Sequence, residues 1–250
     1  MTLQPTNPVN ANTTVEIFVV DRKGKSASLA MPLDDYLETL REFIDFVNHQ
    51  VGVYMDALAG FAGNKTRIEF QVARVLRKSQ QRRDDEGINV VVWSSFEDLG
   101  SPDIIHNRIM RATDYIAYNS VHGFNEQQHV RAIIVMLFSF WDEEIRPRLA
   151  RCKNLDPHDI QVDALGDLRI LRHAIIHNKG VLSVGAHAKL KVMKGMFVPD
   201  SAIIVSHDQM HKLFVFVKQG VAALILEHTG QRPGSPQISE IVDLAIQRKR

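Results

Sequence analysis

The sequence predicts a mainly α-helical fold with short β-hairpins. Over long stretches of the chain, apolar residues recur at spacings of three and four, which is the pattern of one face of an α-helix. Short apolar runs that flank turn residues predict a minority of strands. With 250 residues, 45% of them hydrophobic, the chain can bury the core of one large domain or of two small ones.

The first hundred residues predict a disordered tail followed by an α+β region. Residues 1–14 are polar, with two prolines and three asparagines, which is typical of disorder. In residues 15–100, VEIFVV and SASLAM flank DRKGK and predict a β-hairpin with Gly24 in its turn. One helix is expected from Pro32 to the glycines of AGFAGN, and a second over Lys65–Arg83. INVVVW is expected to form a strand, and the loop after it places a domain boundary near residue 100.

The second of these helices is strongly basic. Arg74, Arg77 and Lys78 are candidates for contacts with RNA phosphates. The alternative is an ordinary solvated helix face, neutralised by the acidic residues at 84–86. Because the 30 basic residues nearly balance the 29 acidic ones, a nucleic-acid interface would have to be a local patch.

Residues 101–230 predict a helical domain. A helix is expected over Asp103–Val121, and another begins at Asn125, which can cap it. This second helix is apolar on almost every side from Val130 to Phe138, which is typical of a buried, central helix. Pro147 is expected to end or to kink it.

The rest of this domain predicts two more helices and a second hairpin. One helix is expected from Val162 to Asn178, with Gly180 in a left-handed position after it. LKVMKGMFV and AIIVS predict the hairpin, and Ser206 is expected to cap a last helix that ends near Gly230. Residues 231–250 are expected to form a linker and a short basic helix.

The composition argues against several classes of protein. A single cysteine, Cys152, cannot form an internal disulfide and suits a reducing compartment. The N-terminal residues lack the basic and apolar regions of a signal peptide. The apolar runs are far shorter than a membrane span. We therefore expect a cytoplasmic protein with no membrane partner.

The stretch LRHAIIHNKG, residues 171–180, places charged and titratable side chains in an apolar helix. On an ideal helix Arg172 lies among Leu168, Ile175 and Ile176. An unpaired buried charge is costly, by roughly several kcal/mol, so a carboxylate partner is expected. The candidates end the preceding helix: Asp142, Glu143 and Glu144. The simplest interpretation is an ion pair that ties the two helices together.

A second set of side chains, Arg169, His173 and His177, shares another face, because each is four residues from the next. Two histidines at this spacing can chelate a metal ion, but the zinc-protease pattern requires a glutamate after the first of them, where this chain has Ala174. His207 and His211 repeat the spacing without that glutamate. Since no cysteine or clear third ligand is near, neither a metal site nor a cofactor is expected.

Arginine and histidine together suffice for another chemistry. A histidine can move a proton near neutral pH, and an arginine can bind a phosphate through two hydrogen bonds. A base that removes the 2′-hydroxyl proton of RNA lets that oxygen attack the adjacent phosphorus, while the arginine offsets the charge on the phosphoryl oxygens. RNA cleavage of this kind needs no metal ion.

LRHAIIHNKG also resembles the signature of HEPN domains, in which an arginine, a polar residue, a few further residues and a closing histidine are commonly followed by Asn and Gly. Arg172, His173 and His177 occupy these places. The acidic helix end upstream, SFWDEEIRPRL, and the hairpin and helix expected downstream agree with the resemblance. It covers about Pro102–Gly230 and leaves the first hundred residues, whose role is unknown, outside.

The resemblance implies a compact HEPN-like helical bundle that dimerises, with the motifs of both subunits in a shared cleft. Many HEPN domains are metal-independent endoribonucleases of toxin–antitoxin, phage-defence or RNA-processing systems. The implied partners are therefore RNA, a second copy of the chain, and an antitoxin or other regulatory protein. On one ideal helix Arg172 and His177 point about 140° apart, which also favours a site shared between two chains.

The resemblance further implies a role for each motif residue. His177 would be the general base or acid, Arg172 would stabilise the transition state, and His173 would orient the site. One of the three acids would hold Arg172, while Arg169 and Lys179 are further candidates for RNA contacts. Other HEPN domains have lost activity, so the alternative is a non-catalytic HEPN-like module that binds nucleotide, RNA or a protein partner.

Overall fold

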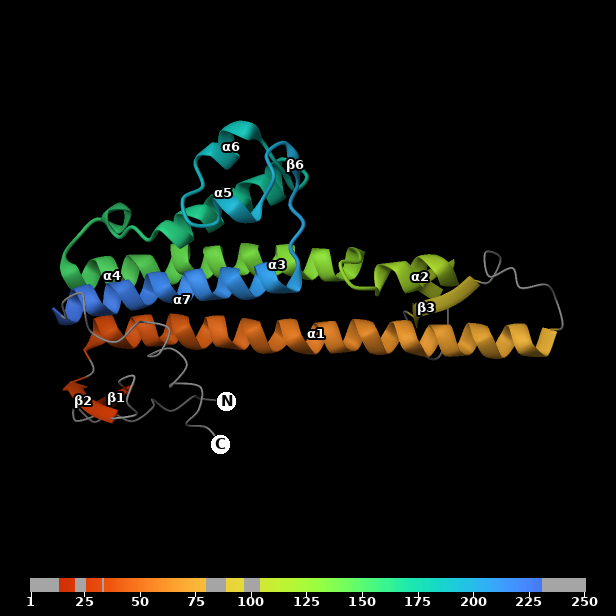
Figure 1. Cartoon of the computed structure of the whole chain (residues 1–250), viewed down its shortest axis with the longest axis horizontal. Coiled ribbons are helices and arrows are strands. Elements are labelled where there is room, and N and C mark those ends of the chain that lie inside the picture. Colours follow the sequence, from red (N-terminus) through yellow and green to blue (C-terminus); the bar gives the residue numbers. More distant parts are fainter. Residues whose placement is uncertain (1–13, 21–25, 33, 80–88, 97–103, 231–250) are drawn as a thin grey trace. The chain divides into compact units, whose positions relative to one another are not determined.

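The computed structural model describes residues 14–20, 26–32, 34–79, 89–96 and 104–230, and the fold is mainly helical, as predicted (Figure 1). The chain divides into two compact units. Unit 1 consists of Met1–Asn48, Val135–Ile203 and Asp208–Arg250, and unit 2 of His49–Ile134 and Ile204–His207. The predicted N-terminal tail up to residue 13 and the predicted linker and basic helix over residues 231–250 lie outside the described residues.

The first hairpin is confirmed. Strand β1 (Thr14–Val20) pairs antiparallel with β2 (Ser26–Pro32), so that Thr14 lies opposite Pro32 and Val20 opposite Ser26. Gly24, expected in the turn, lies outside the described residues.

A single helix follows where two were expected. Helix α1 (Asp35–Ser79) runs for 45 residues without a break at AGFAGN. Asp34 caps it by accepting a hydrogen bond from the backbone N–H of Leu37 (2.9 Å). Gly60 and Gly63 have no atoms within 4 Å of the place where a Cβ would stand, so they require no special backbone geometry. A glycine inside a helix costs only about 1 kcal/mol, which the helical residues on both sides outweigh.

In unit 2, a second hairpin and a short helix follow α1. Strand β3 (Asn89–Phe96) confirms the predicted strand and pairs antiparallel with β4 (Ile104–Arg111), Asn89 lying opposite Arg111. The helix predicted over Asp103–Val121 is therefore wrong in its first half, and only α2 (Ala112–Tyr118) is helical. Pairing with β3 makes Ile104–Arg111 a strand, and the spacing of apolar residues within this segment cannot reveal that pairing. The predicted boundary near residue 100 lies outside the described residues.

The predicted central helix is present and is longer than expected, but it begins at Phe124, so Asn125 lies inside it and does not cap it. Helix α3 (Phe124–Phe140) passes through a π-helical turn, η2 (Trp141–Ile145), into α4 (Arg146–Lys153). Four residues of its apolar run, Val130, Ile133, Ile134 and Leu137, are fully covered, whereas Ala132 and Met136 (41%) are exposed and Val135 is half-buried, so the run is not buried on every side. Pro147 does not end the helix: it lies in the first turn of α4, directly after the wide π turn, where its missing N–H costs no hydrogen bond.

The next helix confirms its prediction, whereas the hairpin predicted after it is wrong. Helix α5 (Asp163–His177) follows the 3₁₀ turn η3 (Pro157–Asp159). LKVMKGMFV forms no strand: it contains the 3₁₀ turn η4 (Lys194–Met196), and it follows α6 (Val184–Ala188). The strands that pair are only two residues each, β5 (Val181–Leu182) and β6 (Ser201–Ala202).

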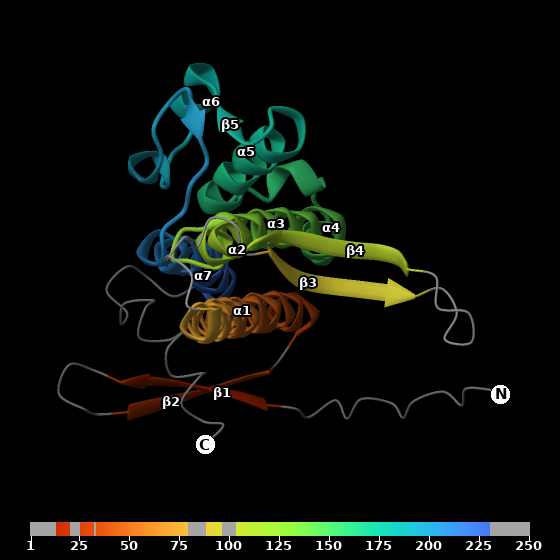
Figure 2. The same cartoon turned by 90° about the vertical axis from the view of Figure 1, so that its right-hand side faces the viewer.

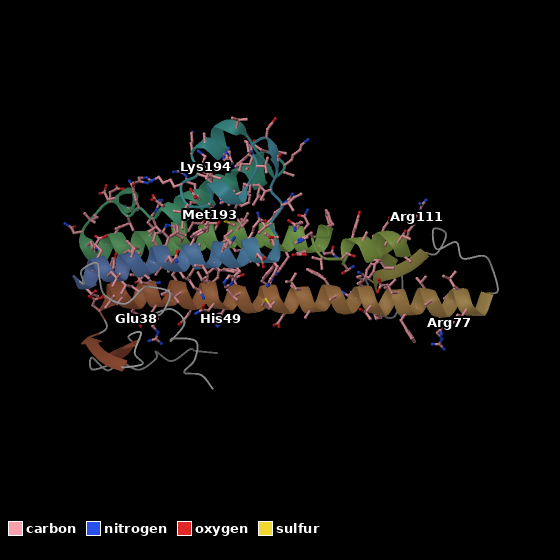
Figure 3. All side chains as sticks on the ribbon, viewed as in Figure 1. Glu38, His49, Arg77, Arg111, Met193 and Lys194 are labelled. Carbon is pink, nitrogen blue, oxygen red and sulfur yellow. The ribbon has the colours of Figure 1, made fainter. Side chains whose placement is uncertain are left out.

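A buried carboxylate explains why residues 191–193 are not a strand. Asp167 of α5, 1% exposed, accepts hydrogen bonds from the backbone N–H groups of Lys191 (2.8 Å), Val192 (2.9 Å) and Met193 (2.8 Å). These three donors are satisfied by a side chain rather than by a partner strand. The loop is thereby held on α5; Figure 3 labels Met193 and Lys194 within it.

The last helix, α7 (His207–Thr229), begins after Ser206 and ends before Gly230, as predicted. In unit 1, side-chain contacts hold it to the start of α1 and to α4: the rings of Tyr36 and His228 stack at 4.3 Å, and Lys153 bonds Glu227 at 3.3 Å. Helix α5 lies beside the α3–α4 segment in both views, with α6 and the short β pair around it (Figures 1 and 2). Among the described residues, every helix is too short or too polar to span a lipid bilayer.

Candidate functional site

The predicted motif lies at the carboxyl end of α5. The helix ends at His177, and the carbonyl oxygen of Ala174 accepts hydrogen bonds from the N–H groups of Asn178 (3.0 Å) and Gly180 (2.9 Å). Gly180 has the left-handed backbone expected of it (φ 77°), and so does Lys179 (φ 54°). This turn exposes the last helical side chains and directs the chain into β5.

The histidine strip, defined as Arg169, His173 and His177, lies on one face of α5, as predicted. All three side chains are exposed. The imidazole rings of His173 and His177 have their centres 4.7 Å apart, at an angle of 41° between their planes. Two titratable rings therefore stand close together in solvent, one helical turn from an arginine.

Arg172 occupies different surroundings from the histidine strip. It is half-buried, and its guanidinium carbon lies 5.8 Å from the centre of the Phe138 ring of α3, within range of a cation–π contact. Its Nε is buried and has no hydrogen-bond partner. The helical wheel had indicated this separation of Arg172 from His177.

The ion pair expected for Arg172 is not found. Asp142 pairs instead with Arg146, four residues later in its own helix, while Glu143 and Glu144 are exposed. Among the described residues, no carboxylate pairs with Arg172. Arg146 lies one helical turn from Asp142 whatever the tertiary structure, which explains why Asp142 pairs with Arg146 and not with Arg172.

A cavity of about 410 Å³ lies beside α5 in unit 1 and shares Arg169 with the histidine strip. Three further cationic side chains line it: Arg146, Lys189 and Lys191. Lys191 donates to Asp163 at 2.5 Å, and this hydrogen bond and the charge of Asp163 raise the pKa of Lys191. Sequence reasoning missed the cavity, because its cations come from three separate segments and form no periodic pattern.

The charge of this cavity is unevenly compensated. The carboxylate of Asp167 accepts hydrogen bonds from backbone N–H groups. Asp163 forms an ion pair with Lys191, and Asp142 forms one with Arg146. Within the described part of the chain, Arg169 and Lys189 have no ion-pair partner. An anion such as a phosphate would therefore meet two uncompensated positive charges there.

The remaining candidates for RNA contacts are spread over both units. Lys179 is exposed just beyond α5 in unit 1. Arg74 and Arg77 are exposed on α1 in unit 2, and the side chain of Lys78 lies outside the described residues. The structure thus groups Arg169, His173 and His177 on one helix face, with Arg172 on another side of that helix.

The described residues contain no cluster of three or more histidine, cysteine, aspartate or glutamate side chains that could hold a metal ion. His207, from the second pair of histidines at helical spacing, stacks on the ring of Tyr54 in unit 2, with the ring centres 5.9 Å apart.

Comparison of the chain with protein-family models, with curated proteins and with solved structures gives no match. Any assignment of function therefore rests on the chemistry of these side chains.

Proposed function

We propose that this chain is a metal-independent endoribonuclease of the HEPN type, from a toxin or phage-defence system, with its active site at the end of α5. The observation that supports the proposal is the exposed pair of imidazoles, His173 and His177, 4.7 Å apart and one turn from Arg169. Two imidazoles can divide the two proton transfers of RNA cleavage between them.

The reaction follows from these groups. His177 removes the proton of a 2′-hydroxyl, whose oxygen forms a bond to the adjacent phosphorus while the bond from phosphorus to the 5′-oxygen breaks. His173, in its protonated form, gives a proton to that leaving oxygen. The products are a 2′,3′-cyclic phosphate and a 5′-hydroxyl, so atoms and charge balance without a metal ion. Arg169 binds the phosphate from the same helix face.

Arg172 enters this proposal through a homodimer. Its half-buried position on Phe138 separates it from His177 of its own chain. Ile176, one turn after Arg172, is 47% exposed, and Val181 is 37% exposed. A second copy that covers these side chains would bring its own motif to this surface, so that Arg172 of one chain and His177 of the other act on the same phosphate.

The cavity beside α5 favours a second candidate function, a non-catalytic module that binds a nucleotide or another phosphorylated ligand. Arg169 and Lys189 line the cavity and have no ion-pair partner in the described part of the chain, and binding a phosphorylated ligand needs no pair of histidines. In that case the purified chain binds the ligand but leaves RNA intact.

The deciding experiment is an RNA cleavage assay in the presence of EDTA. The wild-type chain is expected to release fragments with cyclic phosphate ends, and His177→Ala and His173→Ala to lower the rate by roughly 10²- to 10⁴-fold. The matched control is His211→Ala, since His211 is an exposed histidine of α7 that lies away from the motif in sequence. Equal cleavage by the wild type and His177→Ala would refute the proposal.

A further inference from the structure

A second surface with the chemistry of nucleic-acid binding lies on α1, in unit 2. Arg67, Phe70, Arg74 and Arg77 follow one another at spacings of three, four and three residues, so they share one helix face. We call it the Phe70 face. Phe70 is 65% exposed, and the three arginines are exposed as well. An exposed aromatic ring on the same helix face as three cations can stack on a flat group whose charged neighbours the cations bind.

The packing of unit 2 holds the Phe70 face outward. The opposite face of α1 buries Ile68 and Val72 against Ala112 and Tyr115. Turning the helix to cover Phe70 would expose this core. Arg77 accordingly projects from the side of α1 away from α2 (Figure 3).

The Phe70 face is also hollowed. Gly63, Thr66 and Gln71 line a shallow depression together with Arg67, Phe70 and Arg74. At Gly63 no atom lies within 4 Å of the position of an added Cβ, so the space beside the ring is open. A flat group can therefore approach the depression next to the Phe70 ring.

Among the described residues, the arginines of the Phe70 face form no ion pairs. Arg67 donates one hydrogen bond to the side-chain oxygen of Asn64 (3.3 Å), a neutral partner. Glu69, the acidic residue that precedes Phe70, pairs with Lys65 at 3.8 Å. Arg67 and Arg74 thus flank the Phe70 ring at the depression, and Arg77 follows on the same helix face three residues after Arg74.

We propose that the Phe70 face binds single-stranded nucleic acid, with a base stacked on Phe70 and the arginines on the flanking phosphates. Stacking on an exposed aromatic ring combined with a cationic track is how proteins hold unpaired strands without reading their sequence. A duplex keeps its bases stacked on one another and offers none to the ring. A membrane surface is a poorer fit, because an interfacial helix needs a broad apolar face and Phe70 stands alone among arginines.

The proposal goes beyond the ribonuclease activity and does not rest on it. The binding partner is tested as a single-stranded DNA oligonucleotide, which lacks the 2′-hydroxyl and cannot be cleaved by the proposed reaction. Loss of binding and loss of catalysis are therefore measured separately.

The experiment is fluorescence anisotropy with the full chain, a labelled 20-nucleotide strand and EDTA. Phe70→Ala and Phe70→Leu are expected to raise Kd by roughly 5- to 100-fold, the effect of one lost base stack, while Phe70→Trp keeps or improves binding. Arg74→Gln and Arg77→Gln are each expected to reduce the slope of log Kd against log salt concentration by about 0.7. Arg41→Gln, at an exposed arginine elsewhere on α1, is the matched control and should leave Kd unchanged.

Three results would overturn the proposal. One is a Phe70→Ala variant that binds the strand as tightly as the wild type. Another is equal affinity for the strand and for a duplex of the same length, which would indicate charge attraction alone. The third is binding to vesicles rich in phosphatidylserine that Phe70→Ala abolishes, with no measurable affinity for the oligonucleotide.

Discussion

Arg172 lies over the ring of Phe138, with its guanidinium carbon 5.8 Å from the ring centre, and no described carboxylate pairs with it. The buried Nε of Arg172 is out of reach of a ligand, but no described carboxylate occupies the terminal nitrogens of its guanidinium, which leaves them to bind one. Arg172 is therefore not part of an ion pair between the described helices, and the contact with Phe138 favours its interpretation as a phosphate-binding group over a purely structural one.

Replacement of Arg172 tests the two interpretations. Arg172→Ala is expected to cost about 0.5–2 kcal/mol of stability, the range of a cation–π contact, and to leave the protein folded but unable to cleave RNA. Arg172→Lys should not restore cleavage, because lysine lacks the planar fork that grips a phosphate. Thermal unfolding and the cleavage assay measure both effects. Unfolding of Arg172→Ala at room temperature would instead favour the purely structural interpretation.

Mixing two inactive variants tests whether the site is shared between chains. If Arg172 of one subunit acts with His177 of the other, a heterodimer of Arg172→Ala and His177→Ala retains one intact site. Random exchange of subunits should then restore about a quarter of the wild-type activity. Sites contained within one chain predict no restoration. The oligomeric state of each variant, measured by light scattering, serves as the control.

The buried carboxylate of Asp167 is expected to dominate the stability of the loop that follows α6. Asp167→Ala leaves three backbone N–H groups without their acceptor and should cost about 2–5 kcal/mol, measured by urea denaturation. Asp163→Asn is the matched control on the same helix. Its carboxylate is 54% exposed and pairs with an exposed lysine, so its loss should cost less than about 1 kcal/mol. Equal losses would contradict the role assigned to Asp167.

Tyr54 should make the protein sensitive to alkali. Burial, together with the charge of Glu126 and a hydrogen bond to it, raises the pKa of the Tyr54 phenol above its usual 10.0. Because the unfolded chain releases this proton at lower pH than the folded one, the stabilising contribution is present below pH 10 and is lost as pH rises above it. Denaturation midpoints measured from pH 8 to 11 should fall. Tyr54→Phe should flatten this decline, and an unchanged slope would contradict the assignment.

The spacing of residues along the sequence was sufficient to predict which side chains share a helix face and where a helix ends. The spacing of Arg169, His173 and His177 predicted a shared helix face, and Gly180 predicted the end of α5. The apolar run of α3 predicted the burial of Val130, Ile133, Ile134 and Leu137, though not the exposure of Ala132 and Met136. Each of these follows from the geometry of one helix, in which residues three and four apart are always neighbours.

Local spacing did not predict the conformation of segments that are held by residues far away in the sequence. Ile104–Arg111 is a strand because β3 pairs with it, although its own pattern suggested a helix. Residues 191–193 are a loop because the Asp167 carboxylate satisfies their N–H groups. The break predicted in α1 is absent because two exposed glycines weaken a helix without ending it.

Sequence alone determined which side chains of α5 form the candidate site and that Arg172 faces away from His177. Only the tertiary structure decided what surrounds them: Phe138 rather than an acid under Arg172, a cationic cavity next to Arg169, and an exposed ring among the arginines of α1. The physical reason is the range of the interactions. Helix periodicity is set by residues within one turn, whereas burial and charge pairing are set by segments that meet only after the chain has folded.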